Sequence, residues 1–121
     1  MAKKNEILTI RLGYRKPGET RAGWVENMSD DAIWKAGREA WVLKASRAIE
    51  CPLVLILDPE CEVIAAADLL GIKKESMDSD RFEVLGTPYV DHELLGKVVE
   101  RGRSQNPIAY VTEDQIVDRE D

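Results

Sequence analysis

The tryptophans are the residues of this chain whose type and spacing could bind a ligand. Three lie within eighteen residues of one another: Trp24, Trp34 and Trp41. Cationic side chains surround the last of them in sequence, at Arg38, Lys44 and Arg47. An aromatic ring with an arginine beside it can stack an unpaired or flipped base. Packing in the core is the commoner role of tryptophan. Both roles stay open here, and the first predicts a nucleic-acid site around Trp41.

A second candidate surface lies near the other end of the chain, between Lys97 and Tyr110. Arg101 and Arg103 could contact phosphate groups. The side chains that follow can donate and accept hydrogen bonds: Ser104, Gln105 and Asn106. On composition alone, the same stretch is also typical of a solvated loop that ends where Pro107 starts a strand.

Catalytic and metal-binding patterns are missing from the sequence. It contains no G-x-G-x-x-G, P-loop or G-x-S-x-G motif. The single histidine, His92, lies in a polar stretch and is expected at the surface rather than acting as a general base. Cys51 and Cys61 match no zinc spacing, and His92 cannot complete a four-ligand site with them. We therefore expect no catalytic residue, no metal and no cofactor, with the cysteines as buried thiols.

Composition describes an ordinary globular chain of 121 residues, 44% hydrophobic and 33% charged. No apolar run reaches the ~20 residues that a membrane helix needs, and the N-terminus has no apolar signal region, so a cytoplasmic location is expected. The net charge is −6, but residues 1–55 carry +3 and residues 56–121 carry −9. The first half could therefore form a basic face beside an acidic second half.

Local patterns predict the elements that would position these side chains. Ser29 precedes two aspartates and predicts the start of a helix that packs through Ile33 and Ala36 or Ala40. Strands are expected over residues 7–12, 53–58, 62–69, 81–85 and 108–111, the second and third forming a hairpin. We expect a polar loop over 71–80, a short helical turn within 91–99, and an acidic, frayed tail over 112–121. Several short strands and one early helix predict a small α+β barrel or sandwich.

Several segments, taken in order, resemble the PUA-like superfamily, especially its EVE-like and ASCH-like domains. They are Met28–Trp34, Arg38–Trp41, Arg47–Ala48, Arg81–Gly86, Leu95–Lys97 and Ser104–Val111. The resemblance implies a small curved antiparallel β-barrel over residues 1–111 with an early helix packed against it, followed by the tail. It further implies that the first helix ends near Ala40, that Trp41 opens a strand, and that Arg47–Ala48 begins a second helical turn.

Three functions follow from these observations. The resemblance implies a non-catalytic module that reads RNA or a modified DNA base in a pocket. The residue types described above suggest that Arg38, Trp41, Arg47, Gln105 and Asn106 form it. A barrel that pairs its first and last strands would bring these residues together. The acidic second half would instead suit a protein-interaction or regulatory subunit, phage- or defence-related, with a basic partner. The third alternative is a small ASCH-type hydrolase that uses a lysine and a glutamate such as Lys44 and Glu83.

Overall fold

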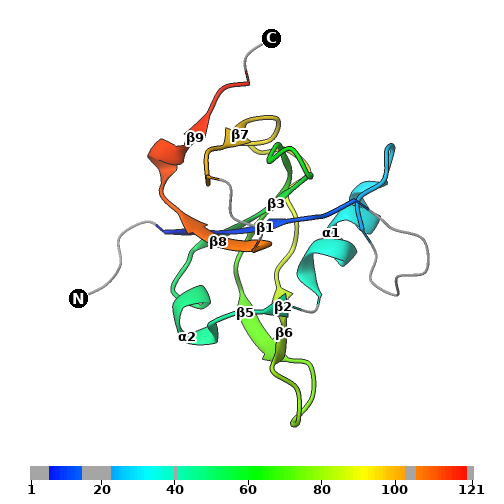
Figure 1. The fold of residues 1–121 in the computed structure, drawn as a ribbon, viewed down its shortest axis with the longest axis vertical. Coiled ribbons are helices and arrows are strands. Elements are labelled where there is room, and N and C mark those ends of the chain that lie inside the picture. Colours follow the sequence, from blue (N-terminus) through cyan, green and yellow to red (C-terminus); the bar gives the residue numbers. More distant parts are fainter. Residues whose placement is uncertain (1–5, 15–22, 40, 103–105, 120–121) are drawn as a thin grey trace.

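The structure is a computed structural model that describes residues 6–14, 23–39, 41–102 and 106–119. The described strands are β1 Ile7–Arg11, β2 Trp41–Val42, β3 Leu53–Leu57, β4 Val63–Asp68, β5 Gly71–Lys74, β6 Arg81–Leu85, β7 Val98–Val99, β8 Ile108–Val111 and β9 Ile116–Val117. The helices are α1 Asp30–Arg38, α2 Ala45–Ala48 and the short 3₁₀ helix η1 Glu113–Gln115. The domain is α+β and built mainly of strands, as the sequence predicts (Figure 1).

The described strands form three sheets, with orders β4-β3-β1-β8, β2-β6-β5 and β7-β9. β1 pairs with β3 in parallel and with β8 in antiparallel fashion, so the first strand does lie beside a strand from the end of the chain. The sheets do not close into a barrel, which corrects the expectation of a closed PUA-like barrel. The physical reason lies in the outer strands: among the described residues, β4 and β8 at the edges of the four-stranded sheet do not pair as strands with each other or with β2 and β5 at the edges of the three-stranded sheet.

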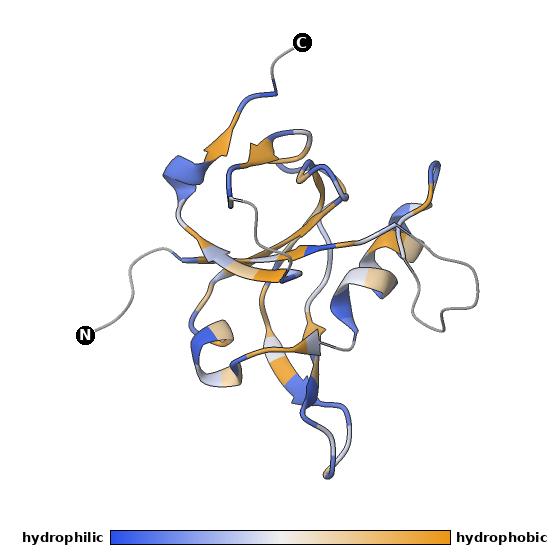
Figure 2. Cartoon of the chain, viewed as in Figure 1, coloured by the Kyte–Doolittle hydropathy of each residue, from blue (hydrophilic) through white to orange (hydrophobic). Residues whose placement is uncertain are grey.

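Both faces of the four-stranded sheet are covered. Leu8 and Ile10 belong to one buried cluster with residues of α1, while Ile7 belongs to a second cluster on the opposite face. The same alternation separates Ile56 from Leu57 on β3. Because both faces are buried, the central strands are hydrophobic at nearly every position instead of alternating with polar residues (Figure 2).

Helix α1 forms as the sequence predicts. The Ser29 side chain accepts a hydrogen bond from the Ala32 N–H, 3.1 Å away, and caps the helix. Ile33 and Ala36 are buried against the sheet. Gly37 approaches β3 so closely that a Cβ atom there would lie 2.3 Å from Ile56 Cδ1. A glycine is therefore needed at this position for the helix to reach the sheet.

The segment after α1 confirms part of the sequence analysis. Trp41 opens β2, and a short second helix, α2, forms after it. This helix begins at Ala45 and ends at Ala48, so Arg47 and Ala48 complete the helical turn and do not begin it as expected. Ala40, where the first helix was expected to end, lies outside the described residues, and α1 itself ends at Arg38. None of the described helices is long and apolar enough to cross a membrane.

Three segments were expected to form a loop, a helical turn and a frayed tail, and all three expectations were wrong. The predicted polar loop over 71–80 begins with β5, which pairs with β6 from Gly71↔Leu85 to Lys74↔Phe82. The segment 91–99 contains a turn and then β7 rather than a helical turn. Residues 112–117 of the tail are not frayed, because η1 leads into β9 and β9 pairs with β7. Cross-strand pairing supplied by distant residues determines the structure of these polar segments.

Candidate functional site

A cavity of about 490 Å³ lies where the two larger sheets meet, and we call it the junction cavity. Its described lining includes Arg11, Trp41, Val42, Arg81, Asn106 and Pro107. Its size falls within the usual range for sites that bind small molecules or single nucleotides. The lining is largely apolar, but two arginines and one amide supply positive charge and hydrogen-bonding groups that suit an anionic ligand.

Strand pairing from both sheets positions these residues. Ile10 pairs with Ile108, and the Arg11 N–H donates to the Pro107 carbonyl at 2.8 Å, which holds the end of β1 beside the start of β8. In the other sheet, Val42 of β2 pairs with Arg81 of β6. Residues from opposite ends of the chain therefore reach one cavity at the ends of strands from two sheets.

Arg101 fixes the turn that carries Asn106. Its guanidinium donates to the Pro107 carbonyl at 3.0 Å and to the Asn106 carbonyl. Asn106 Oδ1 in turn accepts from the Ile108 N–H at 3.0 Å. Partial burial lowers the pKa of Arg101. The arginine expected to contact phosphate is thus directed at the backbone, and its role is to position the turn.

Trp41 belongs to the core more than to the cavity. Its side chain is 7% exposed, and its indole N–H donates to the Gly37 carbonyl at 2.7 Å. Only a small part of the ring can therefore face a ligand. A base stacked fully on Trp41 would require the ring to leave this position, so the ring serves as a wall of the cavity.

The structure brings together some of the residues that the sequence selects and separates others. Trp41 and Asn106 line the same cavity. Arg38 does not line it: its guanidinium forms an ion pair with Glu83 and lies 3.5 Å from Glu39. Gln105, like Arg103 and Ser104, lies outside the described residues.

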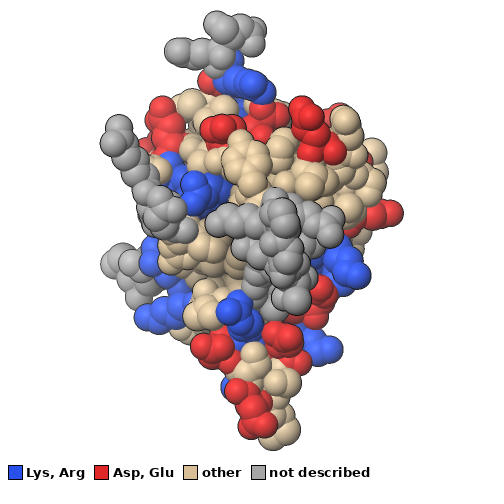
Figure 3. Space-filling view, turned by 45° about the vertical axis from the view of Figure 1, so that its right-hand side comes forward, with Lys and Arg blue, Asp and Glu red and all other residues tan. Residues whose placement is uncertain are grey.

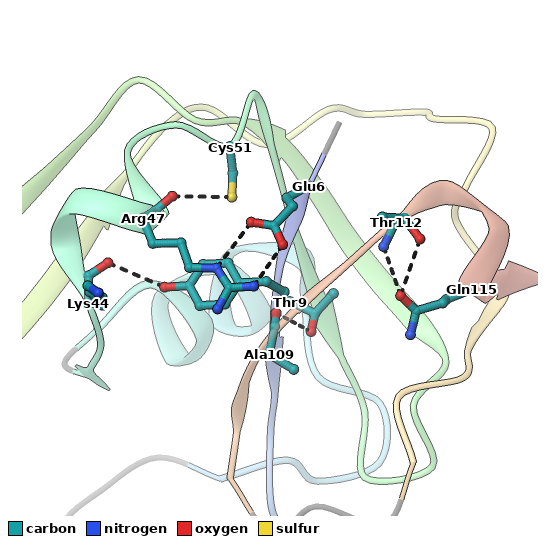
Figure 4. A network of polar contacts seen from close by, with 9 residues as sticks. Glu6, Thr9, Lys44, Arg47, Cys51, Ala109, Thr112 and Gln115 are labelled. Carbon is teal, nitrogen blue, oxygen red and sulfur yellow. Dashed lines mark hydrogen bonds and ion pairs between the residues drawn. The ribbon is translucent and has the colours of Figure 1, made fainter. Parts of the chain in front are cut away.

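Arg47 also lies away from the junction cavity, in a clamp formed with Glu6 and Tyr110 (Figure 4). Its Nη2 and Nε atoms donate to the two carboxylate oxygens of Glu6 at 2.7 and 3.1 Å. The guanidinium carbon lies 4.2 Å from the centroid of the Tyr110 ring. The hydrogen bond to Glu6 raises the pKa of Arg47. The clamp joins the residue before β1 to α2 and β8, which is a structural role.

Two arginines of the cavity, Arg11 and Arg81, were missed by the sequence analysis. Arg11 ends β1, and Arg81 begins β6. Their position at the ends of strands could have marked them as candidate site residues in the sequence. Nothing in the sequence, however, indicated that β2 would pair with β6 and bring Arg81 to the residues of β1.

The other candidate groups are placed as follows. Glu83, the carboxylate of the hydrolase alternative, is engaged by Arg38. Cys51 is 2% exposed, and burial raises the pKa of its thiol to about 11. Within the part of the chain that the structure describes, no three His, Cys, Asp or Glu side chains are arranged to hold a metal ion.

The surface charge is mixed on the face drawn in Figure 3. Acidic side chains gather toward the top, where lysine or arginine side chains also lie, and both kinds are interspersed lower down. A basic face made only by the first half of the chain is not seen in this view. Arg11 and Arg81 supply positive charge locally, at the junction cavity.

No protein-family model matches this chain, and neither a curated protein nor a solved structure matches it significantly. The resemblance to PUA-like domains stays a prediction. Function is inferred below from the residues and their positions.

Proposed function

We propose that this protein is a non-catalytic nucleic-acid-binding module that receives a nucleotide in the junction cavity. The observation that carries the proposal is the cavity lining, where Asn106 from the end of the chain meets Arg11 and Arg81 from two different sheets. Arginines offset the charge of phosphate groups, and an asparagine amide can read the edge of a base.

The burial of Trp41 refines this proposal. Because the ring is 7% exposed, little of the affinity is assigned to stacking on it. Contacts to phosphate from the two arginines supply most of the binding, and Asn106 supplies the discrimination between bases. Affinity is therefore expected to fall steeply with salt.

The proposed relation to PUA-like domains belongs to the same hypothesis. It is supported by the order of elements, with a capped helix followed by a tryptophan that opens a strand and by a second helical turn. The open arrangement of the described sheets departs from that family's barrel.

The test is a binding titration by fluorescence anisotropy with labelled single-stranded RNA and DNA, with and without modified bases, at about 50 mM salt where phosphate contacts are strong. Arg81→Gln is expected to weaken binding about tenfold and to reduce the slope of log affinity against log salt by about one. Lys73→Gln is the matched control, since Lys73 is exposed on β5, carries the same charge and does not line the cavity.

Asn106→Asp tests the cavity separately. An aspartate keeps an oxygen that can accept from the Ile108 N–H, so the turn is preserved, but it adds a negative charge and removes the amide donor. Binding is expected to be lost while thermal stability stays close to that of the parent. If the parent binds no oligonucleotide at low salt, the proposed function is wrong. If it binds but both cavity variants bind equally well, the site lies elsewhere.

A protein partner is the second candidate. The net charge of −6 favours a basic partner over the phosphate backbone of a nucleic acid. Binding of a protein partner becomes the favoured function if the protein binds no oligonucleotide in the titrations.

A further inference from the structure

Tyr14 and Trp24 form an aromatic corner outside the junction cavity, in which Tyr14 is exposed and Trp24 is partly buried against the core. Their ring centroids lie 5.7 Å apart and their planes meet at 78°. The two residues form an isolated β-bridge, and the Trp24 N–H donates to the Gly13 carbonyl at 2.8 Å. The Tyr14 side chain is 56% exposed. The backbone thus holds two rings at right angles, with ring surface open to solvent.

The corner borders an open hollow of about 520 Å³, whose described lining is Tyr14, Trp24, Val25 and Glu26. Carboxylates supply the charge around it. The Tyr14 hydroxyl donates to Glu60 Oε1 at 3.3 Å. Partial removal from water and then the carboxylates of Glu60 and Asp58 raise the pKa of Tyr14. The described lining contains no lysine or arginine.

Aromatic faces and carboxylates favour the same kind of ligand. The face of an aromatic ring carries negative partial charge and attracts a cation within about 6 Å of its centroid. The acidic groups add to this attraction and repel phosphate. The described lining of the hollow therefore has the opposite preference to that of the junction cavity, although Gly13 lines the cavity and Tyr14, the next residue, lines the hollow. Arg15, Lys16 and Arg21, which follow Tyr14 in the sequence, lie outside the described residues.

We propose that this hollow binds a methylated lysine side chain of a partner protein. A lysine ammonium is strongly hydrated and gives up water reluctantly. Methylation spreads the charge over a larger, less hydrated surface that fits against the exposed Tyr14 ring beside Trp24. Because the hollow is open on one side, it suits the end of a side chain presented by a chain that crosses the surface. The net charge of −6 also favours a basic partner.

The first experiment is a titration followed by two-dimensional ¹H–¹⁵N NMR, in which the indole N–H of Trp24 reports on the hollow. The probes are a basic peptide with one trimethyllysine, the same peptide with unmodified lysine, and choline with its uncharged analogue 3,3-dimethylbutan-1-ol. The trimethyllysine peptide is expected to shift the Trp24 signal at concentrations about tenfold below those of the unmodified peptide. Choline is expected to bind more weakly than the methylated peptide but more tightly than its uncharged analogue.

Variants of the corner provide the second test. Tyr14→Phe keeps the ring and removes only the hydroxyl, so binding is expected to stay within about threefold of the parent. Tyr14→Leu keeps an apolar side chain without a ring face, and binding is expected to fall about tenfold. Tyr14 is exposed, so both variants should fold, and the remaining signals of the spectrum check this directly.

Four outcomes overturn the proposal. Equal binding of choline and its uncharged analogue shows that the hollow recognises shape but not charge. Equal affinity for the methylated and unmodified peptides removes the role of methylation. If choline binds as tightly as the methylated peptide, the rest of the peptide adds nothing to the affinity, and the proposal of a protein partner is wrong. Unchanged binding by Tyr14→Leu places the site elsewhere. None of these results depends on whether the protein binds nucleic acid.

Discussion

Replacing Arg47 is expected to destabilise the protein and to leave ligand binding at the junction cavity unchanged. The sequence places Arg47 in the binding site, whereas the structure places it in the clamp with Glu6 and Tyr110. Arg47→Gln removes both hydrogen bonds to the carboxylate and the stacking on the ring. The opposite expectations make this substitution a direct test of the reasoning.

The magnitude follows from the burial of the two partners. The Arg47 side chain is 41% exposed, so the ion pair itself is worth no more than ~1 kcal/mol. The Glu6 side chain is only 17% exposed, and the carboxylate loses a charged donor while it remains largely shielded from water. Stacking on Tyr110 adds about 0.5–1 kcal/mol. The total is about 2 kcal/mol, or a fall in Tm of roughly 8 °C for a chain of this length.

The assay is a double-mutant cycle with Glu6→Gln, Arg47→Gln and the combined variant, each unfolded by urea and by heat. We expect a coupling energy of about 1 kcal/mol between the two positions. Arg47→Lys serves as the control that keeps the charge but loses the paired hydrogen bonds, and it should recover only part of the stability. A coupling energy below about 0.3 kcal/mol would refute the clamp. Normal stability together with weakened oligonucleotide binding would return Arg47 to the ligand site.

Three further outcomes are expected. Gly37→Ala should cost about 1–3 kcal/mol of unfolding free energy in a urea titration, because the new methyl group overlaps the Ile56 side chain, and an unchanged midpoint would contradict this close approach. In thiol labelling at pH 8, Cys61 should react well before Cys51. The Cys51 thiol is buried, and its pKa of about 11 leaves it almost entirely protonated at this pH. Equal labelling rates would show that Cys51 is accessible. Raising the pH toward that value should speed the labelling of Cys51. Arg101→Met should weaken oligonucleotide binding several-fold by releasing the 106–107 turn, and full binding by this variant would show that the turn holds without it.

Local signals in the sequence were sufficient for the elements that form by short-range interactions. Ser29 caps α1 through a hydrogen bond three residues away, and the hairpin of β3 and β4 turns at Asp58, whose Oδ1 accepts from the N–H groups of Glu60 and Glu62 at 2.9 Å. These bonds depend on residues close in sequence. The position of Trp41 at the start of β2 was predicted by resemblance and is confirmed by the structure.

Features that depend on long-range pairing could not be predicted. β5 is polar and exposed at Lys73 and Lys74, and it forms a strand only because β6 offers a partner edge. The sequence could not show that Arg38 would meet Glu83 or that Arg47 would meet Glu6, because each pair spans more than forty residues. Sequence proximity to Trp41 was therefore a poor guide to the cavity lining, and pairing between sheets placed Arg81 there instead.

The two proposed sites share one short segment of the chain, so binding at one site can affect binding at the other. Residues 11–14 run from Arg11 and Gly13 at the junction cavity to Tyr14 at the aromatic hollow. The segment is held at both ends by backbone hydrogen bonds, from the Leu12 N–H to the Leu57 carbonyl and from the Trp24 N–H to the Gly13 carbonyl. These bonds hold the backbone in place, so a movement of the Arg11 side chain is not passed to Tyr14 through the main chain. Because the described linings of cavity and hollow prefer opposite charges, an anion in one and a cation in the other attract each other through space. Binding at the two sites is thus expected to be mutually favourable, and by thermodynamic linkage each ligand must raise the affinity for the other by the same factor.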